Sequence, residues 1–495
     1  MLFNSYLFIF VFLPTTLAIF FGLSRLRLTR LAIAYLVISS LIFYAYWNPA
    51  YLPLLLGSVV VNYGVGRRLS WLRSRGFRPK PWLVLGIAFN LGLIAYFKYA
   101  DFFISTLPVS TASSLRASLQ TVNIALPLAI SFFTFQQIAY LVDAYRGITK
   151  PYSFLDYCLF VCFFPQLIAG PIVHHKDVLH QFHRIKTFCF SQRNMALGLA
   201  MFTLGLAKKV LIADNLSPWV ATVFSQAEAV TFIEAWVGAL SYTFQLYFDF
   251  SGYSDMAIGL ALMFNIRLPL NFNSPYKARS ISDFWRRWHI TLSNFLRDYL
   301  YIPLGGSRRG EPRRYANLIM TMLLGGLWHG AGWTFVLWGG LHGVYLSLNH
   351  AWRRWGIALP ALLSWGITFL AVVASWVLFR ASSLADAIAL LQTMSGLNGI
   401  VLPGEAQGKL GFLTQYGIQL RSWQALSYLP VLNGSKLISL GALAALTLGV
   451  VWLPNTHEIV QRLRPRWWWA AGIGAAAAVS LLSLNRVSEF LYFQF

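Results

Sequence analysis

The feature that most constrains this chain is a series of apolar runs, each long enough to cross a bilayer, that recurs from one end to the other. A spanning helix needs about 20 mostly apolar residues. Of the 495 residues, 57% are hydrophobic and 11% are charged, whereas a soluble domain carries about 25% charged residues. The sequence therefore predicts an all-α, polytopic membrane protein whose residues 1–495 form a single membrane-embedded domain.

Basic clusters between the apolar runs predict the orientation. The first run, 7–23, has no basic residue ahead of it and is followed by Arg25, Arg27 and Arg30. This order is opposite to that of a cleaved signal peptide. Further basic clusters fall on alternate sides of the following runs, as the positive-inside rule requires. We expect a retained first span with the N-terminus outside the cytoplasm.

The net charge of +23 has a second reading, which is nucleic-acid binding. The basic residues stand between hydrophobic spans, and no nucleic-acid-binding module is visible. We therefore expect membrane lipid around the chain and no nucleic acid. Basic cytoplasmic loops would also attract an anionic acyl carrier.

About eleven spans are expected, with re-entrant segments where polar residues, Pro or Gly interrupt an apolar run. The runs 153–173, 193–222 and 232–264 are interrupted in this way. Such breaks persist at membrane depth where protein or a water-filled cavity satisfies the freed backbone groups. The run 315–349 is predicted as one span, and 381–434 is predicted as the longest non-spanning connection.

Residues 280–314 stand apart as a cytoplasmic-side amphipathic helix followed by a basic loop. Ser280 and Asp283 have the spacing of a helix N-cap. An apolar stripe with helical period follows, and its residues are Ile281, Phe284, Trp285, Trp288, Leu292, Phe295, Leu296 and Tyr299. This pattern is typical of an interfacial helix. His289 falls at the edge of the stripe, between a dry interior and a polar surface.

The histidines are the leading candidates for chemistry. His329 lies in an apolar, glycine-rich stretch with no charge nearby. A neutral imidazole there can accept a hydroxyl proton, and the alternative is a structural histidine that bonds a neighbouring helix. On a continuous helix His342 lies far around the wheel from His329, which favours a packing role.

Four further histidines cluster in a predicted loop, and they are His174, His175, His180 and His183. They suggest a metal, but the carboxylate-histidine signature of a metalloprotease is absent. The three cysteines, at 158, 162 and 189, form no metal or disulfide framework. An acyl-cysteine intermediate at Cys162 is the less favoured alternative. We expect no metal.

Asp249 and Asp255 lie within an apolar run, and Ser251-Gly252 between them is a candidate break. Asp249 lines a passage, orients a histidine or caps a half-helix, and Asp255 is expected to cap. Lys208 and Lys209 either extend to the membrane surface or contact an anionic donor.

Several long motifs, taken together and in order, resemble the membrane-bound O-acyltransferase family, and its bacterial polysaccharide-acetylation branch in particular. They are Phe97-Lys98-Tyr99-Ala100, residues 127–147, Phe164-Pro165-Gln166-Leu167-Ile168-Ala169-Gly170-Pro171, residues 247–257, Phe284-Trp285-Arg286-Arg287-Trp288-His289-Ile290, residues 296–301 and Gly326-Leu327-Trp328-His329-Gly330-Ala331. The resemblance extends over nearly the whole chain up to about residue 380. Within the family, the chain is similar to the branch typified by the alginate O-acetyltransferase membrane subunit.

The resemblance implies that His329 is catalytic and that His289 is a second motif histidine. It also implies a ring of tilted and re-entrant helices around a central tunnel. His289, Trp288 and Asp249 are candidate lining residues. The resemblance implies a cytoplasmic acyl donor, with acetyl-CoA or another acyl thioester as substrate and no bound cofactor. A separate periplasmic partner acetyltransferase would then deliver the group to an exopolysaccharide.

The sequence thus predicts an O-acetyltransferase for an exported polysaccharide, of the alginate type. Two alternatives stay open at this stage. A transporter or flippase of a lipid-linked sugar would also contain broken helices and intramembrane carboxylates, although the chain has no detectable internal repeat. A scaffold subunit of a polysaccharide synthase is the other.

Overall fold

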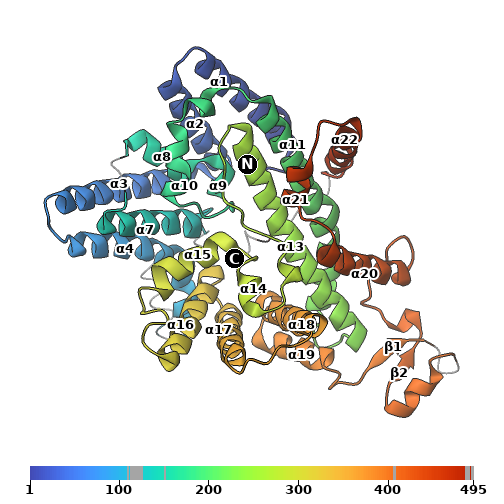
Figure 1. Cartoon of the computed structure of the whole chain (residues 1–495). Helices are drawn as coiled ribbons and strands as arrows, with labels where there is room; N and C mark the ends of the chain where they lie inside the picture. The colour runs from blue at the N-terminus through green and yellow to red at the C-terminus, as the bar shows by residue number, and fades with distance from the viewer. Residues whose placement is uncertain (109–110, 112–125, 150–151, 405–407, 485–490, 492–495) are drawn as a thin grey trace.

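The structure, a computed structural model, describes residues 1–108, 111, 126–149, 152–404, 408–484 and 491. Its described part is almost entirely helical (Figure 1). The strands among these residues are one short pair, β1 (Val401–Pro403) and β2 (Gln419–Arg421), which run parallel with Val401 opposite Gln419. The prediction of an all-α polytopic membrane protein is confirmed.

The N-terminal third of the chain is a set of helices around one apolar core. In chain order they are η1 (Phe8–Phe12), α1 (Leu13–Arg25), α2 (Thr29–Ala45), η2 (Pro49–Tyr51), α3 (Leu52–Ser74), α4 (Lys80–Ile94), η3 (Ala95–Tyr99), α5 (Ala100–Ser105), α7 (Ile130–Arg146), α8 (Phe154–Cys162), α9 (Phe164–Leu167), α10 (His175–Phe182) and η4 (Ile185–Phe188). The η3 segment is a π-helical turn that continues α4 into α5.

The long helix α13 (Phe232–Met263) runs through the centre of the molecule (Figure 1). It begins at Thr231, whose side chain and that of Glu234 form a capping box. It packs along a second helical stretch made of α11 (Gln192–Ala207), η5 (Lys208–Ala213) and α12 (Asp214–Phe224).

The predicted break at Ser251-Gly252 is wrong, because α13 is continuous through these residues. Gly252 instead allows close helix packing. A Cβ added to Gly205 would lie 2.6 Å from the carbonyl oxygen of Gly252, and one added to Gly252 would lie 2.7 Å from that of Gly205. Glycine costs a helix interior about 1 kcal/mol, and here the backbone contact between α11 and α13 compensates.

The single amphipathic helix predicted from Ser280 is also wrong beyond its first turns. Its start is correct, because the Asp283 amide donates to Ser280 Oγ at 3.1 Å. The segment then divides into α14 (Ile281–Trp285), α15 (Ile290–Leu296) and the π-helical turn η7 (Arg297–Tyr301). His289 causes the break, because its φ of 42° lies in the left-handed region, which a helix cannot continue through.

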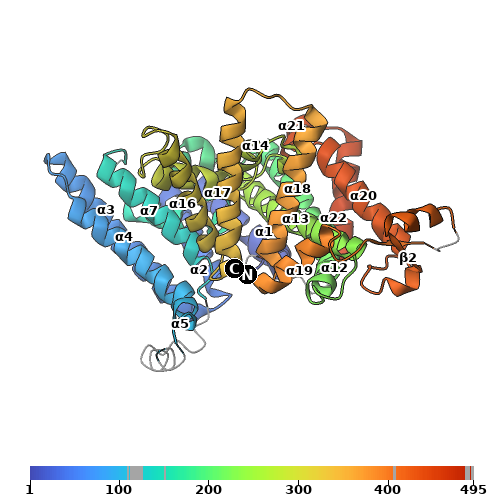
Figure 2. The ribbon, with the colours of Figure 1, turned by 90° about the horizontal axis from the view of Figure 1, so that it is seen from below.

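Two helices, α16 (Glu311–His329) and α17 (Trp333–Arg354), form a hairpin where one span, 315–349, was predicted. The turn is residues 330–332, in which Gly330 and Gly332 are extended. A Cβ at Gly339 would overlap the carbonyl oxygen of Met322, and one at Gly326 would overlap that of Phe335. The two glycines therefore permit a backbone-to-backbone approach that larger residues would prevent. Figure 2 shows α16 and α17 side by side, with α18 (Ala361–Arg380) beside α17.

The C-terminal part covers the other side of α13. It contains α19 (Leu384–Met394), the strand pair, η8 (Gly411–Tyr416), η9 (Trp423–Ala425), α20 (Lys436–Trp452), α21 (Thr456–Arg462) and α22 (Trp467–Leu482). The predicted connection 381–434 corresponds, in its described residues, to α19, the strands and the short turns. A further short turn, η6 (Pro275–Lys277), precedes α14.

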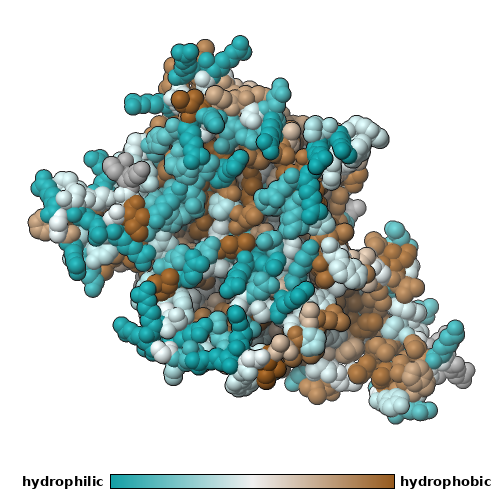
Figure 3. All heavy atoms as spheres, in the orientation of Figure 1, coloured by the Kyte–Doolittle hydropathy of each residue, from teal (hydrophilic) through white to brown (hydrophobic). Residues whose placement is uncertain are grey.

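Among the described residues, five helical segments are long and apolar enough to cross a membrane, or six if a bent pair counts as one span. They are Phe8–Arg25, Pro49–Ser74, Lys80–Ser105, Gln192–Phe224 and Ala361–Arg380, with the bent pair Lys436–Trp452 and Thr456–Arg462. The first corresponds to the predicted first span. The total of about eleven stays a prediction. One face of the molecule is largely hydrophilic (Figure 3).

Two large apolar clusters make up most of the interior. The first joins the N-terminal helices to α15 and the end of α16, and it includes Phe8, Phe133 and Trp328. The second surrounds the first half of α13 together with α14, α17 and α18, and it includes Trp338 and Trp376. The end of α16 lies where these two clusters meet.

The α11–α13 contact gives a direct test of the fold. We expect Gly205→Ala to destabilise the protein by about 1–3 kcal/mol, because the added methyl group would force two backbones apart. Gly366→Ala is the matched control, since Gly366 lies within α18 and a Cβ there meets nothing within 4 Å. Thermal unfolding of the purified protein in detergent measures both. Equal stability of the two variants would contradict the proposed contact.

Candidate active site

His329 is the last residue of α16, and it lies at the seam between the two apolar clusters. Trp328 belongs to the first cluster, whereas Trp338 and Phe379 belong to the second. The centroid of the His329 ring lies 5.0 Å from that of Trp328, 5.2 Å from that of Trp338 and 5.4 Å from that of Phe379. The residue is 7% exposed, so the imidazole is held in an aromatic cage.

His289 approaches the same place from a different element. Its ring centroid lies 6.3 Å from that of His329, and Phe250 of α13 packs edge-on against it at 4.8 Å. The sequence placed His289 at the edge of an apolar stripe, facing a polar surface. That position is wrong, since His289 is 0% exposed. The left-handed backbone at this residue turns the side chain inwards.

The hydrogen bonds of Asn271 assign the tautomer of His289. The Thr291 amide and hydroxyl both donate to Asn271 Oδ1, at 3.4 and 2.9 Å, so this atom is the amide oxygen. His289 Nδ1 lies 3.0 Å from the same oxygen and must donate to it. The Nε2 atom then carries the lone pair. It is buried and has no hydrogen-bond partner among the described residues.

An unpartnered acceptor in a buried position costs free energy. Such atoms in a native protein require an explanation, and a catalytic or binding role is one of the recognised ones. Here the free lone pair belongs to one of two imidazoles that meet at the end of α16. We take His329 and His289 as the core of the candidate active site.

Trp288 and Asp249 are the other predicted lining residues, and both are held by contacts with other residues of the fold. Trp288 stacks on Phe284 with ring centroids 5.7 Å apart and lies 4.9 Å from Trp376. Asp249 forms an ion pair with Lys209 at 2.7 Å and accepts a hydrogen bond from the Leu491 amide at 3.3 Å. Their described contacts do not include either histidine of the site.

Lys208 and Lys209 were predicted either to extend to the membrane surface or to contact an anionic donor. In the structure both lysines instead form ion pairs within the protein. Lys208 pairs with Asp255 at 2.7 Å. Lys209 pairs with Asp214 as well as with Asp249, at 2.6 and 2.7 Å. Asp255 is therefore an ion-pair partner and not the cap of a half-helix. Within the interior these pairs tie η5 to α13.

His342 lies on α17, and the hairpin returns it to the neighbourhood of the site. Trp285 Nε1 donates to its Nδ1 at 3.2 Å, and its Nε2 lies 2.9 Å from Ser375 Oγ. The Ser375 hydroxyl in turn donates to the carbonyl oxygen of Val372 at 2.7 Å. Both ring nitrogens are satisfied, which agrees with the packing role expected from the sequence.

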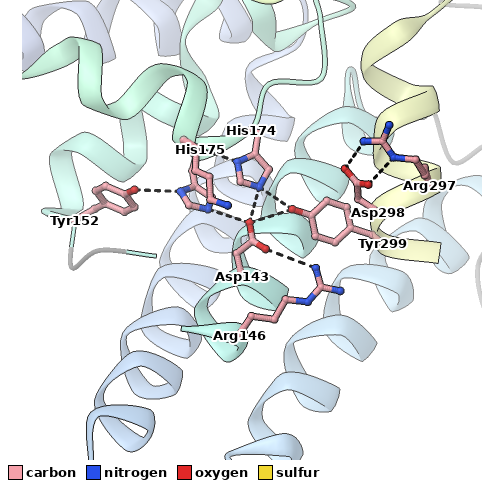
Figure 4. A network of polar contacts seen from close by, with 9 residues as sticks. Asp143, Arg146, Tyr152, His174, His175, Arg297, Asp298 and Tyr299 are labelled. Atoms are coloured by element: carbon pink, nitrogen blue, oxygen red, sulfur yellow. Dashed lines mark hydrogen bonds and ion pairs between the residues drawn. The ribbon is translucent and has the colours of Figure 1, made fainter. Parts of the chain in front are cut away.

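A second cluster of titratable groups joins α7, α10 and η7 (Figure 4). Asp143 Oδ2 lies 2.5 Å from His174 Nε2, 3.1 Å from His175 Nε2 and 3.0 Å from the Tyr299 hydroxyl. Tyr152 completes the network at His175 Nδ1, at 3.1 Å. Burial alone would raise the pKa of Asp143, but the bonds from His174, His175 and Tyr299 outweigh it and hold that pKa well below its usual range.

The ligand atoms of Asp143, His174 and His175 are close enough together to bind a metal. However, the Lys176 amide donates to His174 Nδ1 at 3.2 Å, so the proton of a neutral His174 is on Nε2. A histidine that binds a metal through Nε2 normally carries its proton on Nδ1 and donates it. The arrangement is therefore that of a hydrogen-bonded network. His180 and His183 do not join it, since they contact Lys176 and Asp156. The absence of a metal stays a prediction.

Lys98 and Tyr99 are neighbours of the site that sequence reasoning quoted within a motif but gave no role. The Lys98 ammonium donates to the carbonyl oxygens of Trp328 and His329, at 2.7 and 3.1 Å. The Tyr99 hydroxyl donates to that of Leu327 at 2.6 Å. A lone lysine near the end of an apolar run ordinarily indicates a membrane boundary. The sequence alone therefore does not predict the contact of Lys98 with the end of α16.

Two cavities lie elsewhere in the described molecule. One of about 1280 Å³ is lined by Arg25, Arg27, Arg30 and several phenylalanines between α1 and α10. Another of about 1070 Å³ lies between α11 and α22. His329 lines neither of them. The central tunnel implied by the family resemblance stays a prediction.

The fold and the site define a helical, polytopic membrane protein with a buried pair of imidazoles between two apolar cores. Residues 93–385 match the profile of the membrane-bound O-acyltransferase family. The chain belongs to this family and is an acyltransferase.

The relatives support this assignment over most of the chain. A peptidoglycan O-acetyltransferase of Helicobacter pylori is 49% identical over 432 residues, which are 81% of this chain and 81% of the relative. A probable alginate O-acetylase AlgI of Azotobacter vinelandii is 40% identical over the full length of both chains. A teichoic acid D-alanyltransferase of Streptococcus thermophilus is 28% identical over 46% of this chain and 57% of the relative.

The Asp143 network gives a test of stability. We expect Asp143→Ala to destabilise the protein by about 1–3 kcal/mol, because it leaves the buried Nε2 donor of His175 without its acceptor. Because the pKa of Asp143 is depressed in the folded protein, the stability that this carboxylate contributes is fully present above the pKa of an ordinary Asp, about 4. That stability is lost as the pH falls below this value. Unfolding in detergent at neutral and acidic pH measures both effects.

Asp298→Ala is the matched control for this variant. Asp298 is an exposed neighbour whose ion pair is with the adjacent Arg297 (Figure 4), and such pairs contribute little. A loss as large for Asp298→Ala as for Asp143→Ala would contradict the importance of the buried network.

Proposed function

We propose that this chain transfers an acetyl group from a cytoplasmic thioester, with acetyl-CoA as donor, for the O-acetylation of an exported polysaccharide. The observation that carries the proposal is the meeting of His329 with His289, whose Nε2 lone pair is buried without a partner. Two imidazoles in a dry aromatic setting suit the removal of a proton from a hydroxyl. The family assignment favours this acyl chemistry over transport of a lipid-linked sugar.

The chemistry proceeds as an acyl exchange between sulfur and oxygen. His329 takes the proton of the acceptor hydroxyl while its oxygen attacks the thioester carbonyl. The new C–O bond forms, the C–S bond breaks, and the imidazolium returns the proton to the departing thiolate. General-base help of this kind contributes about 10²–10⁴-fold. Holding both reactants in one narrow place contributes the rest.

His289 has a supporting role in this scheme. Asn271 fixes the orientation of its ring by accepting the Nδ1 proton. Its Nε2 lone pair can accept a hydrogen bond from a second N–H or O–H group of the bound substrates, which would satisfy the buried acceptor when substrate is present. This explains why a folded protein tolerates the unpaired atom in its free state.

The polymer is proposed as an alginate-type polysaccharide, on the strength of full-length similarity to relatives named as probable alginate O-acetylases. Peptidoglycan is the second candidate, because a relative named for that polymer is more nearly identical over a shorter stretch. Since the chain has no separate soluble domain in its described part, we propose that a periplasmic partner acetyltransferase completes the delivery.

The orientation follows from the basic residues. In Figure 2, α5 and the N-terminus lie towards one edge of the molecule, and α14 and α21 towards the opposite edge. The second edge includes the basic segment that begins at Arg279. We propose that it is cytoplasmic, that the N-terminus is periplasmic, and that the protein resides in the bacterial inner membrane.

The role of His329 is tested by replacing it. We expect His329→Ala to lower acetyl transfer from radiolabelled acetyl-CoA, measured in inner-membrane vesicles, by at least about 10²-fold, because the base is removed. The variant should still insert and fold, with an unfolding temperature lowered by the cavity that the truncation leaves in the aromatic cage. His180→Ala, an exposed histidine bonded to the Lys176 carbonyl, is the matched control and should keep full activity. An active His329→Ala protein would overturn the proposed mechanism.

A further inference from the structure

The C-terminal end of α16 has an unusual set of partners. The last four carbonyl groups of any α-helix lack intrahelical donors. In α16 these belong to Gly326, Leu327, Trp328 and His329. The Gly330 amide donates to the first at 3.4 Å. The remaining three are satisfied by side chains of another element.

Those side chains come from two consecutive residues of η3, the π-helical turn between α4 and α5. Tyr99 donates to the Leu327 carbonyl at 2.6 Å. Lys98 donates to the Trp328 and His329 carbonyls at 2.7 and 3.1 Å. The ammonium also lies 5.9 Å from the centre of the Trp328 ring. A π-helical turn inside a longer helix is often found at functional sites.

The position of Lys98 suits a donor at a helix C-terminus. The C-terminus of a helix carries partial negative charge, and a cation there is stabilising. Lys98 forms none of the ion pairs found among the described residues, unlike Lys208 and Lys209. Its ammonium is therefore committed to the helix end that carries the catalytic histidine.

We propose that Lys98 and Tyr99 are positioning residues for the acyltransferase reaction, and that they hold His329 in place by capping the end of α16. The inference rests on the proposed catalytic role of His329. Beyond His329 the chain continues into Gly330 and Gly332, which give the helix end little stiffness of their own. Without the cap the last turn of α16 would fray and the imidazole would lose its fixed relation to His289.

The test compares variants with acetyl-CoA as the probe and the full-length protein in lipid nanodiscs, together with its acceptor fraction. Lys98→Met should lower kcat by about 10²-fold, the cost of a misplacement of about 1 Å, while KM for acetyl-CoA stays within about twofold. Lys98→Arg, which keeps the charge and the donors, should recover most of the rate. Tyr99→Phe should give a smaller loss of kcat, again without a change of KM.

Hydrogen exchange provides a readout that does not depend on activity. In Lys98→Met, amides near the end of α16 should exchange faster than in the unaltered protein, while amides of α13 do not. Should Lys98→Met fail to fold, the Tyr99→Phe variant decides the matter, because it removes a single hydroxyl.

Lys436→Met is the matched control. Lys436 also donates from one ammonium to two backbone carbonyls, those of Trp423 and Leu426, both at 2.7 Å. Its loss should leave kcat unchanged. Equal losses in the Lys98 and Lys436 variants, or a folded Lys98→Met protein with normal kcat, would overturn the positioning role. An active His329→Ala protein would instead overturn the proposed function, so the two failures are distinguishable.

Discussion

The backbones of α16 and α17 touch through Gly326 and Gly339, and the position of His329 at the candidate site follows from this contact. The hairpin ends α16 at His329 in the interior, between two apolar cores, instead of carrying the chain onward through the membrane. It also returns Trp338 to the imidazole as one wall of its cage. A side chain at either glycine would separate the helices and open this arrangement, because the neighbouring atoms are backbone and cannot move aside cheaply.

Around this hairpin, polar groups serve two different purposes. Most are paired within the fold. Lys209 binds Asp249 and Asp214, and His342 is bonded on both sides. These groups fix helices against one another in an interior where an unpaired charge is costly. His289 differs from these, since its Nε2 is one of several buried polar atoms without a hydrogen-bond partner in the described part of the chain, and it lies where His289 meets His329. An acceptor left unpaired beside a second imidazole accords with membership of an acyltransferase family.

Much of this could be predicted from the sequence, and the failures have physical causes. Composition gave the membrane class, and an isolated ionisable residue in an apolar run indicated His329. The hairpin was missed because Gly330-Ala331-Gly332 is as apolar as the helices it joins, so hydrophobicity does not mark the turn. The inward turn of His289 depends on a left-handed backbone at a non-glycine residue, which no periodicity reveals. The ion pair of Asp249 with Lys209 could not be predicted because the two residues lie far apart in the sequence, and the lining role of Asp249 stays a prediction.

Donor and acceptor are proposed to meet at His329, and a structure with a donor analogue bound tests this most directly. The suitable ligand is a thioether analogue of acetyl-CoA that keeps the carbonyl and cannot react. A base must lie about 2.6–3.2 Å from the hydroxyl oxygen, which in turn lies about 3–3.5 Å from the carbonyl carbon. The carbonyl carbon should therefore lie within about 6 Å of a His329 ring nitrogen. An analogue bound with its carbonyl remote from both histidines, at a site that competes with acetyl-CoA, would contradict it.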